Sequence, residues 1–274
     1  MRNKFYTCRY DIAFKEIFMN HKNKDILVAL LESVLNIKIK ELSYLNNEKI
    51  VDNINVKRKH FDLFIKTNLG KIQVEVNSGI RPYTRNRNAA YIFDTYCHET
   101  LIGEDYSNIL LIVQINFTYG LGVDEKDFRL YKLMDDEHNE FVGNLLIYEY
   151  NMDYYNKIWY SNDKEKIDES KYIIMQDLKL EDLEELSKDD KVVEKYMGEL
   201  ERVNKLPEFR EFMSAEEDNR KIENTMRNYA IKEGIKEGIK ESAKAFIKNG
   251  VDLEIIKKSL NLSDEEIEEI KKDL

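Results

Sequence analysis

The sequence has few of the residues that interrupt regular structure, with 2 prolines and 10 glycines among 274 residues. This scarcity argues against extensive disorder, and the length is compatible with one domain plus an appendage or with two small domains. Hydrophobic residues make up 42% and charged residues 35% of the chain, which is typical of a soluble protein rich in surface helices. We therefore predict mostly helix around a small sheet.

Cysteine, histidine and long apolar runs are also scarce. The 2 cysteines and 4 histidines are scattered along the chain, which argues against a disulfide framework or a zinc site. No apolar run approaches the roughly 20 residues that span a bilayer, and residues 1–10 lack the apolar core of a signal peptide. We expect a cytoplasmic protein with no membrane partner.

The net charge of -10 argues against a generally basic nucleic-acid binder, but the charge is unevenly divided. Residues 1–122 carry 17 Lys and Arg against 13 Asp and Glu, whereas residues 123–274 carry 26 against 40. The amino-terminal part therefore has a balance of +4. Because phosphate contacts depend on nearby charge more than on the total, this part can present a local DNA-binding surface.

Residues 59–77 are expected to form a β-hairpin around a turn at residues 67–70, because two runs of alternating apolar residues flank that turn. In this pattern Asp62 lies opposite the apolar face of the first run. Glu75 and Asn77 lie opposite the apolar face of the second run. A strand pair that presents such oxygen-bearing side chains on one face suits a hard divalent cation.

Two helices are expected before the hairpin. Phe14, Ile17 and Phe18 recur at helical spacing after Asp11, which is a plausible helix cap. Asp11 is also a weaker candidate for the functional site. A second helix over about residues 25–35 has one polar exception near its centre, Glu32. Glu32 could reach a metal site, but a solvated helix face explains it more simply.

Basic residues lie on both sides of the hairpin. Lys57, Arg58 and Lys59 lie shortly before Asp62, where a phosphodiester would lie, although charge runs are often only solvated faces. A helix is expected over about residues 83–101. The candidates for nucleic-acid binding are Lys57, Lys59, Arg85, Arg87 and Tyr91, the last two being four residues apart on one helical face.

The remainder of the chain predicts one central strand and then mostly helix. Residues 109–117 are nearly continuously apolar and indicate a strand buried on both faces, and a second strand is expected over 144–150. Residues 229–241 repeat every four residues, which places Ile231, Ile235 and Ile239 on one helical stripe beside Gly234 and Gly238. Close approach of another helix would offset the cost of these glycines, and an exposed linker helix is the alternative.

Together these patterns predict an α/β fold in which a small mixed sheet is flanked by helices and followed by a helical carboxyl-terminal region. We expect three parts. These are a core over residues 1–160, a helical extension over 161–228, and the glycine-repeat helix with a short helical tail over 229–274.

Several stretches, in their order along the chain, resemble a known family. Their order resembles that found in the recombination-promoting nucleases, which are also described as transposases. These proteins belong to the PD-(D/E)XK nuclease superfamily, whose core is like that of restriction endonucleases. The resemblance covers most of the chain, and it is carried by the stretches Asp11 to Phe18, Asp62, Glu75-Val76-Asn77, Arg87 to Tyr91, the Glu-Gly-Ile-Lys repeat, Lys248 to Gly250 and Leu262 to Glu266.

The resemblance implies Mg²⁺-dependent hydrolysis of DNA in recombination or mobile-element processing, with Mn²⁺ as a substitute. Asp62, Glu75 and the backbone carbonyl of Val76 would hold the ion. Asn77 stands at a third catalytic position where the family has Lys or Gln, and an amide cannot act as a base. We accordingly expect either weak cleavage or cleavage that depends on the ion and on Lys57, Lys59 or Arg85 for charge.

Two other functions remain open from the sequence. The fold could bind DNA or a protein partner without cutting, as Asn77 and the acidic total charge suggest. Alternatively, the helical tail could be the functional part, as an element that assembles a homodimer or a higher homo-oligomer.

Overall fold

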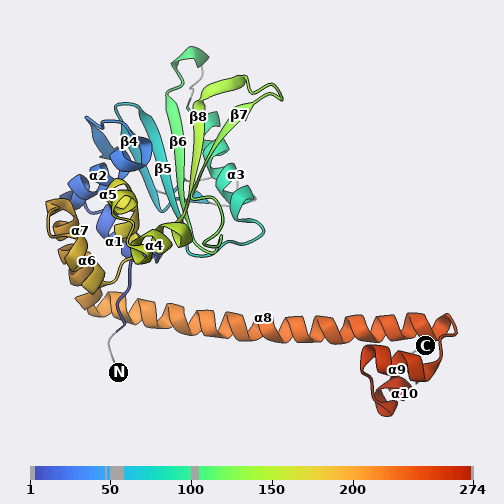
Figure 1. The fold of residues 1–274 in the computed structure, drawn as a ribbon. Helices are drawn as coiled ribbons and strands as arrows, with labels where there is room; N and C mark the ends of the chain where they lie inside the picture. The colour runs from blue at the N-terminus through green and yellow to red at the C-terminus, as the bar shows by residue number, and fades with distance from the viewer. Residues whose placement is uncertain (1–3, 47, 50–58, 100–104, 273–274) are drawn as a thin grey trace. The chain divides into compact units, whose positions relative to one another are not determined.

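The computed structural model describes residues 4–46, 48–49, 59–99 and 105–272. Contacts divide the chain into two compact units, Met1–Leu206 and Pro207–Leu274. The first unit is a mixed sheet with flanking helices, as predicted, and the second is helical (Figure 1). The expected three-part division stays a prediction.

The first unit contains a six-stranded sheet with the strand order β1-β4-β5-β6-β8-β7. The central strands β5, β6 and β8 run parallel, and the outer pairs β1/β4, β4/β5 and β7/β8 are antiparallel. A short pair, β2 and β3, stands apart from it. The strands are β1 Leu42–Tyr44, β2 Glu48–Lys49, β3 Lys59–His60, β4 Leu63–Thr67, β5 Gly70–Asn77, β6 Leu111–Thr118, β7 Phe128–Met134 and β8 Glu140–Asn151.

The predicted hairpin is the antiparallel pair β4/β5, in which Leu63 lies opposite Val74. Its tight connection depends on Gly70, whose φ of +152° and close approach to the Leu111 carbonyl leave no room for a Cβ. Beyond that turn β5 pairs with β6 over its whole length, so that Glu75 lies beside Asn116 and Asn77 beside Thr118. The polar ends of two parallel strands therefore meet at one edge of the sheet.

Helices cover both faces of the sheet. On one face Ile92 of α3 (Thr84–Cys97) packs against Ile112 and Leu145. On the other face the Tyr150 hydroxyl donates a 2.8 Å hydrogen bond to the carbonyl of Val34 in α2 (Lys24–Leu35). Leu145 and Tyr150 are an odd number of residues apart on β8, which places them on opposite faces.

The helix α1 (Asp11–Phe18) forms where the apolar spacing predicts it, and Phe14, Ile17 and Phe18 are buried. The expectation that Asp11 caps this helix is wrong. Tyr10 is the residue at the N-cap position and makes no side-chain cap bond, while Asp11 is already helical. The Asp11 carboxylate instead lies 3.2 Å from Lys15 Nζ, one turn along the helix.

The mostly helical region expected after the second strand forms four helices between β8 and residue 206. The 3-10 turn Met175–Asp177 and the extended conformation of Leu178 separate α5 from α6. The helices are α4 Met152–Ser161, α5 Lys164–Ile174, α6 Leu180–Leu186 and α7 Lys191–Lys205.

The second unit consists of the long helix α8 (Pro207–Lys248) and two short helices, α9 (Leu253–Leu260) and α10 (Asp264–Lys272). Gly250, at φ +73°, follows the end of α8, where a left-handed conformation favours glycine. A capping box starts α10, since the Ser263 side chain accepts from the N–H of Glu266 and the Glu266 carboxylate accepts from the N–H of Ser263. Within the described ranges, no helix combines the length and the apolar character that crossing a membrane requires.

Candidate active site

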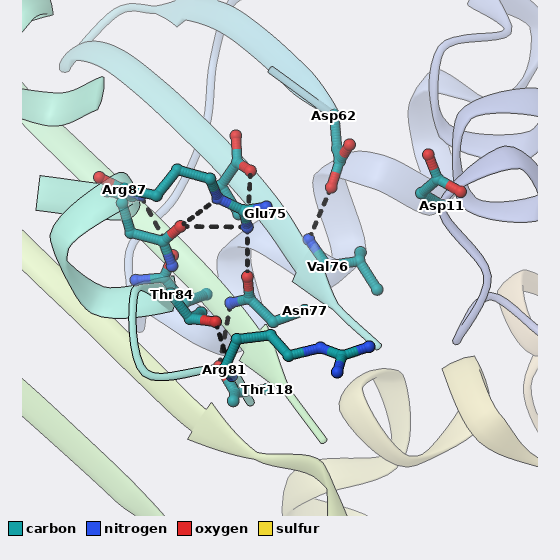
Figure 2. Close-up of polar contacts among 12 residues, drawn as sticks. Asp11, Asp62, Glu75, Val76, Asn77, Arg81, Thr84, Arg87 and Thr118 are labelled. Atoms are coloured by element: carbon teal, nitrogen blue, oxygen red, sulfur yellow. Dashed lines mark hydrogen bonds and ion pairs between the residues drawn. The ribbon is translucent and has the colours of Figure 1, made fainter. Parts of the chain in front are cut away.

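Asp62 lies immediately before β4, where the hairpin holds it against the end of β5 (Figure 2). Its Oδ2 accepts a 2.8 Å hydrogen bond from the backbone N–H of Val76. Its Oδ1 lies 2.9 Å from the ammonium nitrogen of Lys15 on α1. Partners on both oxygens fix the orientation of a carboxylate that is only 13% exposed.

Glu75 is the buried carboxylate of the site, with 3% of the residue exposed. Its Oε2 lies 3.8 Å from Nη2 of Arg87, and its Oε1 has no hydrogen-bond partner among the described residues. Burial raises the pKa of Glu75 well above its ordinary value, and the charge of Asp62 raises it further, while Arg87 lowers it only in part. A buried carboxylate oxygen without a partner is costly, so this position favours a bound cation.

Asn77, at the end of β5, is held by hydrogen bonds at both of its polar atoms (Figure 2). Its Oδ1 accepts from Arg87 Nη2 at 2.6 Å, and its Nδ2 donates to Thr118 Oγ1 at 3.1 Å. The residue is 4% exposed. These contacts give Asn77 a clear role in fixing the Arg87 guanidinium beside Glu75.

Arg87 and Tyr91 lie on α3, whose first half packs over the polar ends of β5 and β6. The Arg87 guanidinium also donates to Asn88 Oδ1 and lies 5.9 Å from the centre of the Tyr91 ring. Tyr91 in turn packs edge-on against Phe61, which directly precedes Asp62. The Arg-x-x-x-Tyr pair therefore connects α3 to both carboxylates through packing and charge.

The sequence matches, over residues 8–230, the family described as PD-(D/E)XK nuclease family transposase. The chain belongs to this family. The sheet and its flanking helices are consistent with a PD-(D/E)XK nuclease fold, which confirms the predicted fold class and the resemblance. No curated protein and no solved structure matches the chain.

In this PD-(D/E)XK family member the carboxylate oxygens that could hold a metal come from Asp62 and Glu75. No group of three or more His, Cys, Asp or Glu side chains suited to a metal occurs in the described part of the chain. Mg²⁺ is commonly held by one or two carboxylates and keeps several waters, and Mn²⁺ takes the same oxygen ligands. The unpartnered Glu75 Oε1 beside Asp62 fits such an ion.

Arg85, one of the predicted DNA-binding residues of this family member, lies on α3 and binds a carboxylate on β8. Its guanidinium forms two hydrogen bonds to Glu149 on β8, at 3.3 and 2.9 Å. Glu149 also accepts from the Tyr131 hydroxyl at 3.0 Å and is 5% exposed. Arg85 remains 55% exposed at its side chain, so one edge of the guanidinium still faces solvent.

The other predicted residues are distributed differently. Lys57 lies outside the described residues, and for Lys59 the structure describes only the backbone, in β3. Asp11 approaches the site indirectly, because its partner Lys15 also contacts Asp62. The Glu32 carboxylate bonds to Lys38 Nζ and to the N–H of Ile39, which explains it as a local contact after α2.

Sequence reasoning missed Lys15, Thr118 and Asn88 as parts of this constellation. Asn88 links Arg87 to β6, since its Nδ2 donates to Asn116 Oδ1 at 2.8 Å. The alternation of Gln114, Asn116 and Thr118 with apolar residues along β6 is the one signal that could have indicated polar neighbours for Glu75 and Asn77. No comparable signal marks Lys15, because its contact with Asp62 depends on how α1 packs against the hairpin.

Proposed function

We propose that this protein is a Mg²⁺-dependent DNA endonuclease that acts in recombination or mobile-element processing. The observation that carries the proposal is the unpartnered buried oxygen of Glu75 next to Asp62. Asp62, Glu75 and the Val76 carbonyl would hold the ion, which when bound would polarise the phosphate and lower the pKa of a water. Family membership supports nuclease chemistry on DNA, and the proposed reaction is hydrolysis.

Residues of the chain would orient the metal ligands and adjust their charge before DNA binds. The Val76 N–H and Lys15 orient Asp62, and Arg87 stabilises the ionised form of Glu75. Lys57, Lys59, Arg85, Arg87 and Tyr91 are the proposed contacts to DNA, and they lie in the part of the sequence with a positive balance. Arg85 and Arg87 would contact phosphate with the groups that their present partners leave exposed.

Adding Mg²⁺ or Mn²⁺ to metal-free protein is expected to raise its melting temperature and to switch on plasmid nicking. An ion at about 100 times its Kd stabilises the folded state by about 2.7 kcal/mol. For a unit of this size that corresponds to about 5 to 10 °C. Calorimetry and agarose-gel nicking on the same samples measure both effects, and EDTA should reverse both. Nicking that persists undiminished in EDTA would contradict the proposal.

Binding of DNA, or of a protein partner, without cleavage is the second candidate function. It is favoured by the contacts of Asn77, whose amide is uncharged and is engaged at both polar atoms. In the nicking experiment this function would appear as plasmid that is retarded on a gel but stays supercoiled with either ion.

We further propose that α8 joins two or more copies of the chain. Ile231 and Ile235 are 50% and 59% exposed on one stripe of this helix. A Cβ added at the neighbouring Gly234 or Gly238 would meet no atom of another element within 4 Å, so a second helix could approach closely there. Burial of this apolar stripe against a second copy would offset the low helix propensity of the two glycines.

The double variant Ile231→Glu and Ile235→Glu is expected to reduce the solution mass from a multiple of 32.7 kDa to that of one chain. The added carboxylates would have to be buried in the contact. Ile222→Glu is the matched control, because Ile222 is 61% exposed but lies about two and a half turns away, on the opposite side of α8. Light scattering that finds a single chain for the unaltered protein would exclude the assembly.

A further inference from the structure

Lys15 is the lysine that the described structure places in contact with Asp62, one of the two candidate metal ligands. Its ammonium nitrogen lies 2.9 Å from Asp62 Oδ1 and 3.2 Å from Asp11 Oδ2. The helix that carries it is firmly seated, since Phe14, Ile17 and Phe18 of α1 are fully buried. The backbone position of Lys15 is therefore fixed by the packing of α1 in the core.

The ammonium group of Lys15 retains the capacity for another contact. An ammonium group has three N–H donors, and two carboxylates account for two of them among the described residues. The Lys15 side chain is 32% exposed, and Asp62 is 13% exposed. A phosphate held next to Asp62 would thus lie within reach of a positive charge that is already in place.

The other charged or polar groups described at the site are less suited to this task. Arg87 donates to Asn77 and Asn88 and faces Glu75. Arg85 is bound through two hydrogen bonds to Glu149. Asn77 carries no charge. Lys15 alone among these groups contacts Asp62, the more exposed of the two carboxylates.

We propose that Lys15 is a catalytic residue of this site, whose ammonium group, anchored on Asp62, contacts the scissile phosphate and offsets the negative charge that develops there. The proposal rests on the proposed nuclease function. It assigns to α1 a direct part in the chemistry, in addition to its packing role in the core.

Lys15→Gln is expected to lower the single-turnover rate of DNA cleavage by about 100-fold at saturating Mn²⁺, as is typical when one charge-stabilising donor is lost. Mn²⁺ binding, measured by titration calorimetry without DNA, should stay as tight or become tighter, because a positive charge beside Asp62 has been removed. Lys15→Arg keeps the charge and should cleave at least about 5 times faster than the Gln variant.

Lys71→Gln is the matched control, since Lys71 also forms an ion pair, with Glu99, at the opposite end of β5. It should change neither cleavage nor Mn²⁺ binding. The proposal is overturned if Lys15→Gln cleaves within about threefold of the unaltered protein, or if Lys15→Arg is no faster than Lys15→Gln. Parallel losses of Mn²⁺ binding and cleavage would also overturn it, by showing that Lys15 only fastens α1 to the hairpin. If the unaltered protein binds Mn²⁺ but cuts no DNA, both the proposed function and this role fail.

Discussion

Asp62→Asn and Glu75→Gln are each expected to lower metal-dependent DNA cleavage by at least about 100-fold, because each removes a charged oxygen ligand from a site that has few. Asn at position 62 keeps an oxygen that can accept from the Val76 N–H, and Gln at position 75 keeps the size of the buried side chain. The loss should therefore appear in the cleavage rate and in Mn²⁺ affinity, with the fold retained.

Matched controls exist for both substitutions. Asp153 also accepts hydrogen bonds from backbone N–H groups, those of Gly120 and Gly122, so Asp153→Asn makes the same chemical change at a carboxylate that is not a proposed ligand. Glu99→Gln does the same for a glutamate that pairs with Lys71. Both controls should cleave within about threefold of the unaltered protein. Full activity in Asp62→Asn and Glu75→Gln would show that the active site lies elsewhere.

Glu75→Gln is also expected to stabilise the metal-free protein at neutral pH, because it replaces a buried acid by a neutral group of the same shape. The gain should be about 1 to 2 kcal/mol, measured by chemical unfolding in EDTA. Added Mg²⁺ should raise the stability of the unaltered protein but not that of this variant. Opposite effects on stability and activity are the expected mark of a residue kept for function.

The sequence alone predicted the elements in which local pattern and tertiary environment agree. The alternation on both sides of Gly70 predicts the β4/β5 hairpin and the side of the strand on which Glu75 and Asn77 lie. The continuous apolar run predicts β6 at the centre of the sheet. Both predictions are confirmed because burial on one face of a strand imposes alternation of apolar and polar residues, and burial on both faces imposes a nearly continuous apolar run.

Features that depend on long-range packing could not be predicted in this way. The β7 strand has no clear apolar alternation because most of its residues are exposed, so only its pairing with β8 defines it. The contact between Lys15 and Asp62 requires α1 to pack against the hairpin. The pair between Arg85 and Glu149 joins residues 64 positions apart. A sequence read alone shows these charges but not their partners.

Arg87→Ala is expected to destabilise the metal-free protein by about 2 kcal/mol at neutral pH. Its guanidinium is the cation nearest to Glu75 in the described structure, and the substitution also leaves Asn77 Oδ1 without its donor. Loss of one partner of a buried ion pair costs about 3 to 5 kcal/mol, but the separation of 3.8 Å and the 39% exposure of Arg87 reduce the expected cost. Arg129→Ala, which removes the partner of the exposed Glu125, should cost less than about 1 kcal/mol.

The pH dependence separates the charge of Arg87 from its hydrogen bonds. The pKa of Glu75 is raised in the folded state, so the folded state keeps a proton that the unfolded state has lost above its ordinary pKa of 4.5. Stability from neutral Glu75 is therefore fully present below that value and is lost as pH rises through the raised folded pKa. Without Arg87 the folded pKa rises further, which extends this loss to higher pH.

The deficit of Arg87→Ala should accordingly be larger at pH 8 than at pH 4, as measured by urea unfolding in EDTA. At pH 4 Glu75 is largely neutral in both states, and only the lost hydrogen bonds to Asn77 and Asn88 contribute. In the Glu75→Gln background the same substitution should cost a similar amount at both pH values, because no titrating carboxylate faces Arg87 there. An equal deficit at pH 4 and pH 8 in the unaltered background would show that Arg87 acts through hydrogen bonds alone, and that the charge of Glu75 is balanced by another group.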